Sequence, residues 1–439
     1  MQVHLLGMNA VLFWYKLVGG LPYTWPGGPN LKNDTLVTVD TIKDIKRDKL
    51  WMVWTLVFGF FIAAYFSYGG LQIMDIFDEC ATTFTVILKV EDFIGMMTTI
   101  LLRIHMIGQA KRLADACSRM HILCNTHGFK GNPYYSDKYI LTVAGHHLIG
   151  FMCICYGNVS MAVAEGTIHY FRIANLFEAT VKPLVFNLSM MMYSHLINLQ
   201  AKIYSQFLDY VAEDDDQTSP IPPQIANWTT SPARMTRGTT RGTTRVNTII
   251  QLPQNTATYP TYTINTDKAK ILLFDLYDSH QYIKGYFQFM VGLGLLHSTI
   301  SSIVSCFLAA IAERKTFPEY VATVGLLLMT LFPPFFLTNV PRALNIQREE
   351  LRVVIKRMRH DKRVTHKKDE MGDLLELLEE DPGFDMGGFF TLGRARMVDI
   401  LSFVATYMVI LLQFKVTENK PDNPLCINGT VAVGTLPSE

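Results

Sequence analysis

Polar residues recur at helical spacing inside an otherwise apolar segment near the C-terminus. Residues 393–414 read GRARMVDILSFVATYMVILLQF. The positions that fall near steps of 3.6 residues, with a small apolar residue among them, are Asp399, Ser402, Thr406, Val409 and Gln413. They share one helical face. Because lipid cannot satisfy polar groups, the stripe indicates either a helix lining a water-filled path or a polar seam packed on neighbouring helices.

A phenylalanine directly follows this stripe. Phe414 is turned about 100° from Gln413 around the helix. A ring of phenyl groups from several copies excludes water and ions, whereas a ring of amide oxygens can coordinate a partly dehydrated cation. In a channel formed by several copies, Gln413 and Phe414 would therefore be the candidate gate, and Asp399 would concentrate cations at the opposite mouth.

Charged side chains also lie inside two other apolar segments. One segment carries Glu91 and Asp92, and another carries Glu178 and Lys182 at the i,i+4 spacing of a favourable helical pair. A charge within a bilayer costs roughly 2.5–3.5 kcal/mol on insertion scales, so these groups should face the bundle interior. They indicate either mutual neutralisation or a wet cavity in the outer half of the bundle.

The elements that must hold these residues are helices that cross a membrane. Seven segments are long and apolar enough, at about 50–73, 84–108, 139–163, 171–199, 282–312, 319–340 and 397–414. The 439 residues are 49% hydrophobic and only 18% charged, whereas soluble proteins carry about 25% charged residues. We therefore predict an all-α, polytopic membrane protein with seven transmembrane helices.

The distribution of basic residues predicts the orientation. Lys and Arg concentrate in the N-terminal segment and in the loops 109–138, 201–281 and 341–396. The opposite side carries only Arg314, Lys315, Lys415 and Lys420. Because basic loops stay in the cytoplasm, we expect a cytoplasmic N-terminus and an extracellular C-terminus.

The last segment resembles a known receptor family. Residues 406–414 read TYMVILLQF, which is similar to the TYhhhhhQF signature of insect gustatory receptors, and residues 389–392 (FFTL) match the FFxL pattern that usually precedes it. The resemblance implies a homotetrameric, ligand-gated, non-selective cation channel in the plasma membrane of sensory neurons, with the last helices around a central pore. Its partners would be a small tastant, further copies of itself, membrane lipid and permeant monovalent cations, with calcium as a further candidate.

The resemblance also implies a ligand pocket among the outer halves of the first six spans. By depth, the candidate ligand-binding residues are Glu91, Asp92, Tyr156, Asn158, Asn175, Glu178, Ser302, Tyr320 and Thr323. All five Trp lie on the predicted cytoplasmic side, which removes the best stacking platform for a sugar. An acidic pocket with Tyr and Ser suits an amine or another plant metabolite. The ligand is thus a plant secondary metabolite of the bitter type or a sugar such as fructose.

Two other classes of membrane protein share some of these features. A G-protein-coupled receptor also has seven spans, but it has an extracellular N-terminus, and its usual motifs after the third span and in the seventh are absent from the sequence. A polytopic membrane enzyme would need clustered His, Asp or Glu within the spans. We find no catalytic constellation, metal site, cofactor site or basis for nucleic-acid binding, and expect no enzyme.

These observations predict a division of the chain into five parts. They are a cytoplasmic N-terminal segment (1–49), a ligand-binding bundle (50–340) with a disordered cytoplasmic loop at about 214–266, cytoplasmic anchor helices (341–396), a pore helix (397–414) and an extracellular tail (415–439). Seven cysteines exclude a complete disulfide framework. Cys80, Cys306 and Cys426 lie on the predicted outer side, where two of them could form one disulfide. The sequon at Asn428 could carry a glycan.

Overall fold

The computed structural model describes residues 23–24, 46–47, 49–57, 59–60, 83–126, 133–164, 170–211, 265–311, 316–360, 368–379, 384 and 391–418. The larger part of the predicted first span, nearly all of the predicted disordered loop and most of the C-terminal tail lie outside these residues.

Nearly all described residues are helical, so the all-α prediction is confirmed. The labelled helices are α3 (Thr83–Gly108), α4 (Ala110–Thr126), α5 (Pro133–Ala164), α6 (Tyr170–Ser205), α7 (Phe207–Val211), α8 (Thr266–Ala310), α9 (Phe317–His360), α10 (Lys368–Glu379) and α11 (Arg394–Glu418). Two-residue strands, β1 (Tyr23–Thr24) and β2 (Lys46–Arg47), pair antiparallel.

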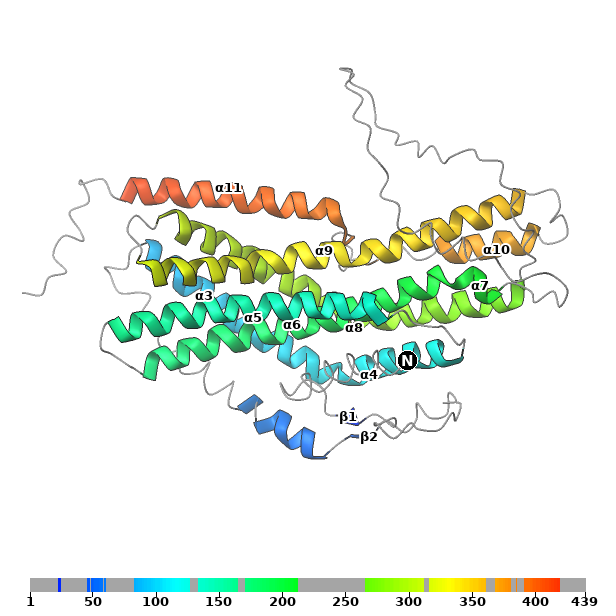
Figure 1. Ribbon diagram of the computed structural model, residues 1–439, viewed down its shortest axis with the longest axis horizontal. Coiled ribbons are helices and arrows are strands. Elements are labelled where there is room, and N and C mark those ends of the chain that lie inside the picture. Colours follow the sequence, from blue (N-terminus) through cyan, green and yellow to red (C-terminus); the bar gives the residue numbers. More distant parts are fainter. Residues whose placement is uncertain are drawn as a thin grey trace, which may run out of the picture.

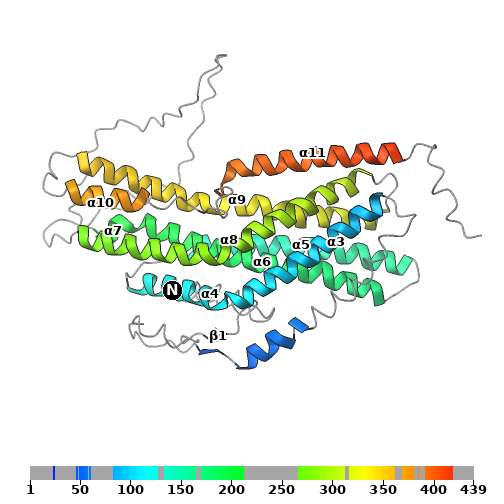
Figure 2. The same cartoon turned by 180° about the vertical axis from the view of Figure 1, so that it is seen from behind.

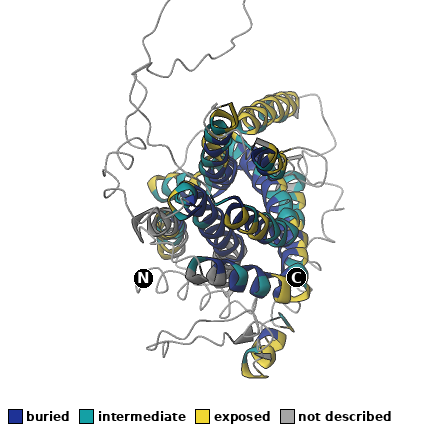
Figure 3. Cartoon of the chain, turned by 90° about the vertical axis from the view of Figure 1, so that its right-hand side faces the viewer, coloured by how far each residue is buried: buried dark blue, intermediate teal, exposed yellow. Residues whose placement is uncertain are grey.

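The long helices run side by side along the longest axis of the molecule (Figure 1). α3 and α4 form a pair bent by 61°. α4 lies on the opposite side of the bundle from α11, whereas α3 runs from α4 towards α11 and contacts it (Figure 2). Seen from one end, the buried residues gather on the inner sides of the helices and the exposed residues on the outer sides (Figure 3). One continuous apolar core therefore joins α3 to α10.

α8 is the central helix of this arrangement, and its sequence explains where it begins. The side chain of Asn265 caps it by accepting a hydrogen bond from the backbone N–H of Lys268 at 3.0 Å. Asp267 in the first turn complements the helix dipole. Buried residues recur along the helix from Thr266 to Phe307, so α8 contacts neighbours along most of its length.

α9 stays one helix although it contains Pro333, Pro334 and Pro341. Each proline removes one backbone donor. The hydroxyl of Thr338 donates to the carbonyl of Pro334 at 2.8 Å, and the amide of Asn339 donates to the carbonyl of Phe335 at 2.7 Å. Each of these side chains thus bonds to the carbonyl four residues before it, within the proline-containing part of the helix.

Glycines allow α5 and α9 to approach closely. A Cβ on Gly157 of α5 would lie 2.4 Å from the Cβ of Ala322 on α9. On α9, a Cβ on Gly325 would lie 2.6 Å from the Cβ of Cys153. Small residues of this kind permit close backbone packing between membrane helices.

Three of the described helices, α8, α9 and α11, are long and apolar enough to cross a membrane, and the bent pair α3–α4 would make a fourth. The total of seven spans and the positions of the two termini stay predictions, because the count applies to the described residues only.

Candidate functional site

The polar stripe of α11 is exposed along its whole length. Every predicted member has an exposed side chain in the single chain: Asp399, Ser402, Thr406, Val409 and Gln413. Phe414 is also exposed, at 57%. Only 11% of the apolar window of α11 is buried, against 61% for α8, so α11 is the least covered of the candidate spans.

The opposite face of α11 packs on the bundle. Its buried or half-buried residues include Met397, Ile400, Val404 and Leu411, and the helix contacts α8 and α9. At 100° per residue, the centre of the polar stripe lies about 160° from the centre of this packing face. The polar stripe therefore points away from the protein's own helices.

Local bonds fix the side chains of the stripe. Arg396 forms an ion pair with Asp399 at 2.9 Å, one turn along the helix. The hydroxyl of Thr406 donates to the carbonyl of Ser402 at 2.8 Å. Asp399 and Thr406 are both exposed, so their oxygens keep lone pairs that can accept hydrogen bonds from water.

One predicted ligand-binding residue makes a bond between helices. The hydroxyl of Ser301 on α8 donates to the carboxylate of Glu91 on α3 at 2.5 Å. The neighbouring Ser302 is buried, and its hydroxyl donates to the carbonyl of Ser298. Asp92 is exposed. The structure therefore brings Glu91 to the same part of α8 as Ser302.

A second group of predicted ligand-binding residues lies where α5 meets the start of α9. The half-exposed ring of Tyr156 meets the ring of Phe317 edge-on, at 6.5 Å between centroids. Tyr320 is 61% exposed, and the hydroxyl of Thr323 donates to the carbonyl of Glu319. Three further predicted residues are Asn158, Asn175 and Glu178. Their backbone is part of α5 or α6, but the structure does not describe their side chains.

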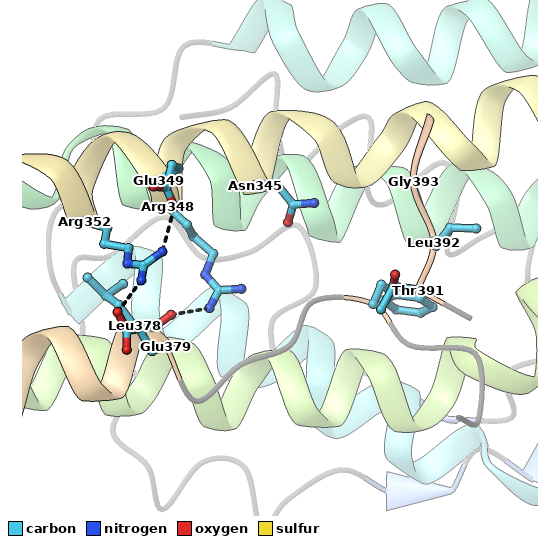
Figure 4. A pocket seen from close by; sticks show the side chains of 10 residues that line it. Asn345, Arg348, Glu349, Arg352, Leu378, Glu379, Thr391, Leu392 and Gly393 are labelled. Atoms are coloured by element: carbon cyan, nitrogen blue, oxygen red, sulfur yellow. Dashed lines mark hydrogen bonds and ion pairs between the residues drawn. The ribbon is translucent and has the colours of Figure 1, made fainter. Parts of the chain in front are cut away.

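A cavity of about 620 Å³ lies at the other end of the bundle, beside the start of α11. Its walls come from the second half of α9, the end of α10 and the segment that enters α11 (Figure 4). They carry Asn345, Arg348, Glu349, Arg352, Leu378, Glu379, Phe384, Thr391, Leu392 and Gly393.

Two arginines of α9 hold α10 against this cavity. Arg348, only 9% exposed, donates to the carbonyl of Leu378 at 2.9 Å. Arg352 forms ion pairs with Glu379 and, at 3.4 Å, with Glu349. This region follows the predicted end of the span at 340. The hydrogen bond from Arg352 keeps the pKa of Glu379 below its ordinary value and raises the pKa of Arg352.

α10 is also bound to the start of α8. Lys270 pairs with Asp373 at 2.7 Å, and the hydroxyl of Thr266 donates to Glu370 at 2.5 Å. α8, α9 and α10 thus form one unit at this end of the molecule. Its position corresponds to the predicted anchor helices, whose role the contacts leave as a proposal.

Ser301 and the cavity residues were not among the site residues predicted from the sequence. No local pattern marks Ser301, because its partner is 210 positions away. Phe384 had a usable indication, since it is an aromatic residue directly after the breaker Asp381-Pro382-Gly383. Cys306 is a free thiol, whereas Cys80, Cys426 and Asn428 lie outside the described residues. Within the described residues, no three His, Cys, Asp or Glu side chains could hold a metal ion together.

Comparisons with known proteins agree with this architecture. The sequence model of the 7tm chemosensory receptor family matches residues 244–418. No curated protein matches the chain by sequence.

Solved structures of one insect receptor share the fold. The olfactory receptor OR5 of Machilis hrabei in complex with eugenol superposes with a TM-score of 0.60, at 9% identity, over 92% of this chain and 97% of that chain. A second structure of the same receptor superposes with a TM-score of 0.56, at the same identity and coverage. The family match thus covers the C-terminal part of the chain, and the solved structures share the fold of most of it.

Proposed function

We propose that the protein is a taste receptor of the gustatory type that acts as a ligand-gated, non-selective cation channel in the plasma membrane of sensory neurons. The observation that carries the proposal is the direction of the polar stripe on α11, which faces away from the bundle and is exposed in the single chain. Lipid cannot satisfy such a stripe. Four copies arranged around an axis would enclose it in a pore, and the TYMVILLQF segment favours the gustatory branch over the olfactory one.

The ligand is a small tastant bound in the outer half of the bundle. Glu91 on α3 and Ser301 on α8 supply a carboxylate and a hydroxyl there, and Tyr156 supplies an aromatic edge on α5. This chemistry suits an amine-bearing plant metabolite, because a carboxylate forms a charge-assisted hydrogen bond with an ammonium group. A sugar is the competing ligand class.

Whole-cell recording from cells that express the full chain tests this function. The panel comprises sugars, polyols, amines, plant alkaloids and eugenol, the last because the related olfactory receptor binds it. A current that persists when G proteins are blocked from the cytoplasmic side supports a channel. A current that disappears under that block supports the G-protein-coupled alternative.

Cysteine substitution then tests whether the stripe lines the pore. A charged thiol reagent is expected to block Ser402→Cys and Thr406→Cys channels. Leu401→Cys is the matched control, because Leu401 is also exposed but lies about 100° around the helix from Ser402. Equal modification and block at all three positions would contradict a pore along this stripe.

A further inference from the structure

The segment that enters α11 is fixed to the bundle by one buried aromatic residue. Phe384 lies between α10 and α11 and is only 2% exposed. Its carbonyl accepts a hydrogen bond from the backbone N–H of Leu392 at 2.7 Å. Leu392 is itself buried and lies two residues before the start of α11. The position of Phe384 therefore determines where α11 begins.

The ring of Phe384 lies between two long helices. It meets the ring of Tyr193 on α6 edge-on, with the centroids 4.8 Å apart, and that of His280 on α8 at 6.4 Å. A hydrogen bond of 2.9 Å between His280 Nδ1 and Gln200 Oε1 joins α8 to α6 at the same level. A relative movement of α6 and α8 must therefore move this ring, because close-packed interiors transmit displacement.

Further ring contacts continue from Tyr193 towards α3. Tyr193 meets Phe287 at 5.6 Å, and Phe287 meets Tyr286 at 4.7 Å. The imidazole of His105 on α3 meets Tyr286 at 5.4 Å and hydrogen-bonds to the carbonyl of Tyr286 at 2.8 Å. The same α3 carries Glu91, about 21 Å from His105 by helical rise. Ring contacts thus run from the helices of the candidate ligand site to the start of α11.

We propose that Phe384 is the positioning residue that transmits movements of α6 and α8 to the pore helix α11. The inference rests on the proposed function only in assigning a pore to α11. Two features let the segment move. A Cβ on Gly393 would have no neighbour within 4 Å, and Phe384, Leu392 and Gly393 all border the 620 Å³ cavity. A shift of Leu392 and Gly393 is therefore directed towards the cavity rather than into packed atoms.

A double-mutant cycle on the purified full chain in lipid nanodiscs tests the coupling without any ligand or current. Hydrogen exchange of the backbone amides 398–402 in α11 is measured for wild type, Phe384→Leu, Tyr193→Leu and the double variant. Each single variant is expected to raise exchange by about 2- to 10-fold, the range that corresponds to loss of one aromatic pair. The double variant is expected to exchange no faster than the faster single one, because both changes remove the same contact.

Phe207→Leu is the matched control, since Phe207 on α7 is as deeply buried as Phe384. It should leave exchange in α11 within about twofold of wild type, as expected for a distant site. If Phe384→Leu lowers the yield of folded protein, Phe384→Met enters the same cycle. The proposal is overturned if the exchange rate of the double variant rises by the product of the two single-variant increases. It is also overturned if Phe207→Leu raises exchange in α11 as much as Phe384→Leu does.

Recording with an agonist from the panel separates ligand binding from opening. Phe384→Leu should lower the maximal current at equal surface expression by about fivefold, while the half-maximal concentration changes less than about twofold. Phe384→Tyr, which keeps the ring, should restore the current. A shift in half-maximal concentration alone contradicts the coupling role. If wild type gives no current with any compound, the channel proposal fails, and the exchange cycle still decides the role of Phe384.

Discussion

The hydroxyl of Ser301 on α8 donates a 2.5 Å hydrogen bond to the carboxylate of Glu91 on α3. The two residues lie on the helices that also carry His105, Tyr286 and Phe287 at deeper positions. A charge-assisted bond of this kind is short and stronger than a neutral one. It fixes α3 against α8 within the region where we place the ligand.

Ser301→Ala should weaken activation by the ligand. The change leaves Glu91 without this donor, and a hydrogen bond to a charged group contributes about 1.5–3 kcal/mol. The half-maximal agonist concentration should therefore change by about tenfold or more. Dose–response curves at equal surface expression measure it. Ser305→Ala, at another buried serine of α8, should change the curve little, and an unchanged curve for Ser301→Ala would remove Glu91 from the ligand site.

Gly157→Ala should destabilise the contact between α5 and α9. The added Cβ would lie 2.4 Å from the Cβ of Ala322 and 2.8 Å from the carbonyl oxygen of Pro318, and overpacking of this kind costs about 1–3 kcal/mol. Thermal unfolding of the purified protein measures the loss. Gly145→Ala on the same helix meets no atom within 4 Å and should be neutral or stabilising by about 0.5–1 kcal/mol. Equal melting temperatures for both variants would contradict the close approach.

Phe414→Ala should produce a current without ligand. Phe414 is 57% exposed on α11 and adjoins the polar stripe, so a ring of its side chains would close the pore by excluding water. Gln413→Ala should lower the open-channel current and leave ligand affinity nearly unchanged. Single-channel recording measures both. A Phe414→Ala channel that reaches the surface, stays silent at rest and opens with wild-type conductance rules out this gate.

Asp399→Asn should reduce conductance more at low than at high ionic strength. Asp399 is exposed and pairs with Arg396, so its charge acts on cations mainly through the solvent. Salt shortens the reach of such a charge, to about 10 Å at 0.1 M. Unitary currents at two salt concentrations measure the effect. The same fractional loss at both concentrations would indicate a change in pore geometry instead.

Acidification should weaken the attachment of α10 to α9. The hydrogen bond from Arg352 lowers the pKa of Glu379, so its stabilisation is fully present above the ordinary Glu pKa of about 4.3. It is lost as the pH falls through the lower, folded-state value. The melting temperature of wild type should therefore decrease more than that of Glu379→Gln below about pH 4.3. Parallel decreases in the two proteins would show that this ion pair does not contribute.

Tags at the N-terminus and in 220–250 should be protected in intact cells, whereas Asn428 should be accessible to glycosylation. The expectation follows from the concentration of basic residues on one side of the membrane. Antibody staining with and without permeabilisation measures it. Labelling of the N-terminus in intact cells would favour the G-protein-coupled alternative.

The sequence predicts the apolar helices, because their formation depends on local composition. The last helix was expected over 397–414 and occupies Arg394–Glu418, because an uninterrupted apolar segment marks it clearly. α8 was expected from residue 282, whereas it begins at Thr266. Hydropathy detects only the part that lipid can cover. The first turns of α8 are amphipathic and become helical by packing Ala269 and Leu272 into the core.

The site depends on contacts between distant parts of the chain, which local patterns cannot encode. Glu91 could be identified as a costly charge within a span, but Ser301 had no distinguishing pattern before the fold placed α3 on α8. Phe384 is buried because Tyr193 and His280 converge on it from two helices. That the polar residues of α11 share one face, by contrast, followed from residue spacing alone, whereas the exposure of that face is known only from the fold.

The lengths of α8 and α9 have a mechanical consequence. Their 45 and 44 residues correspond to rods of about 66–68 Å, more than twice the thickness of the hydrocarbon core, about 30 Å. Each helix can therefore tilt as a rigid body about a point near its middle. A tilt of about 5° displaces an arm of about 35 Å by about 3 Å at its far end. Because α10 is bound near one end of both helices through Arg352 and Lys270, a slight tilt at their opposite ends displaces α10 by a few ångströms without any helix unwinding.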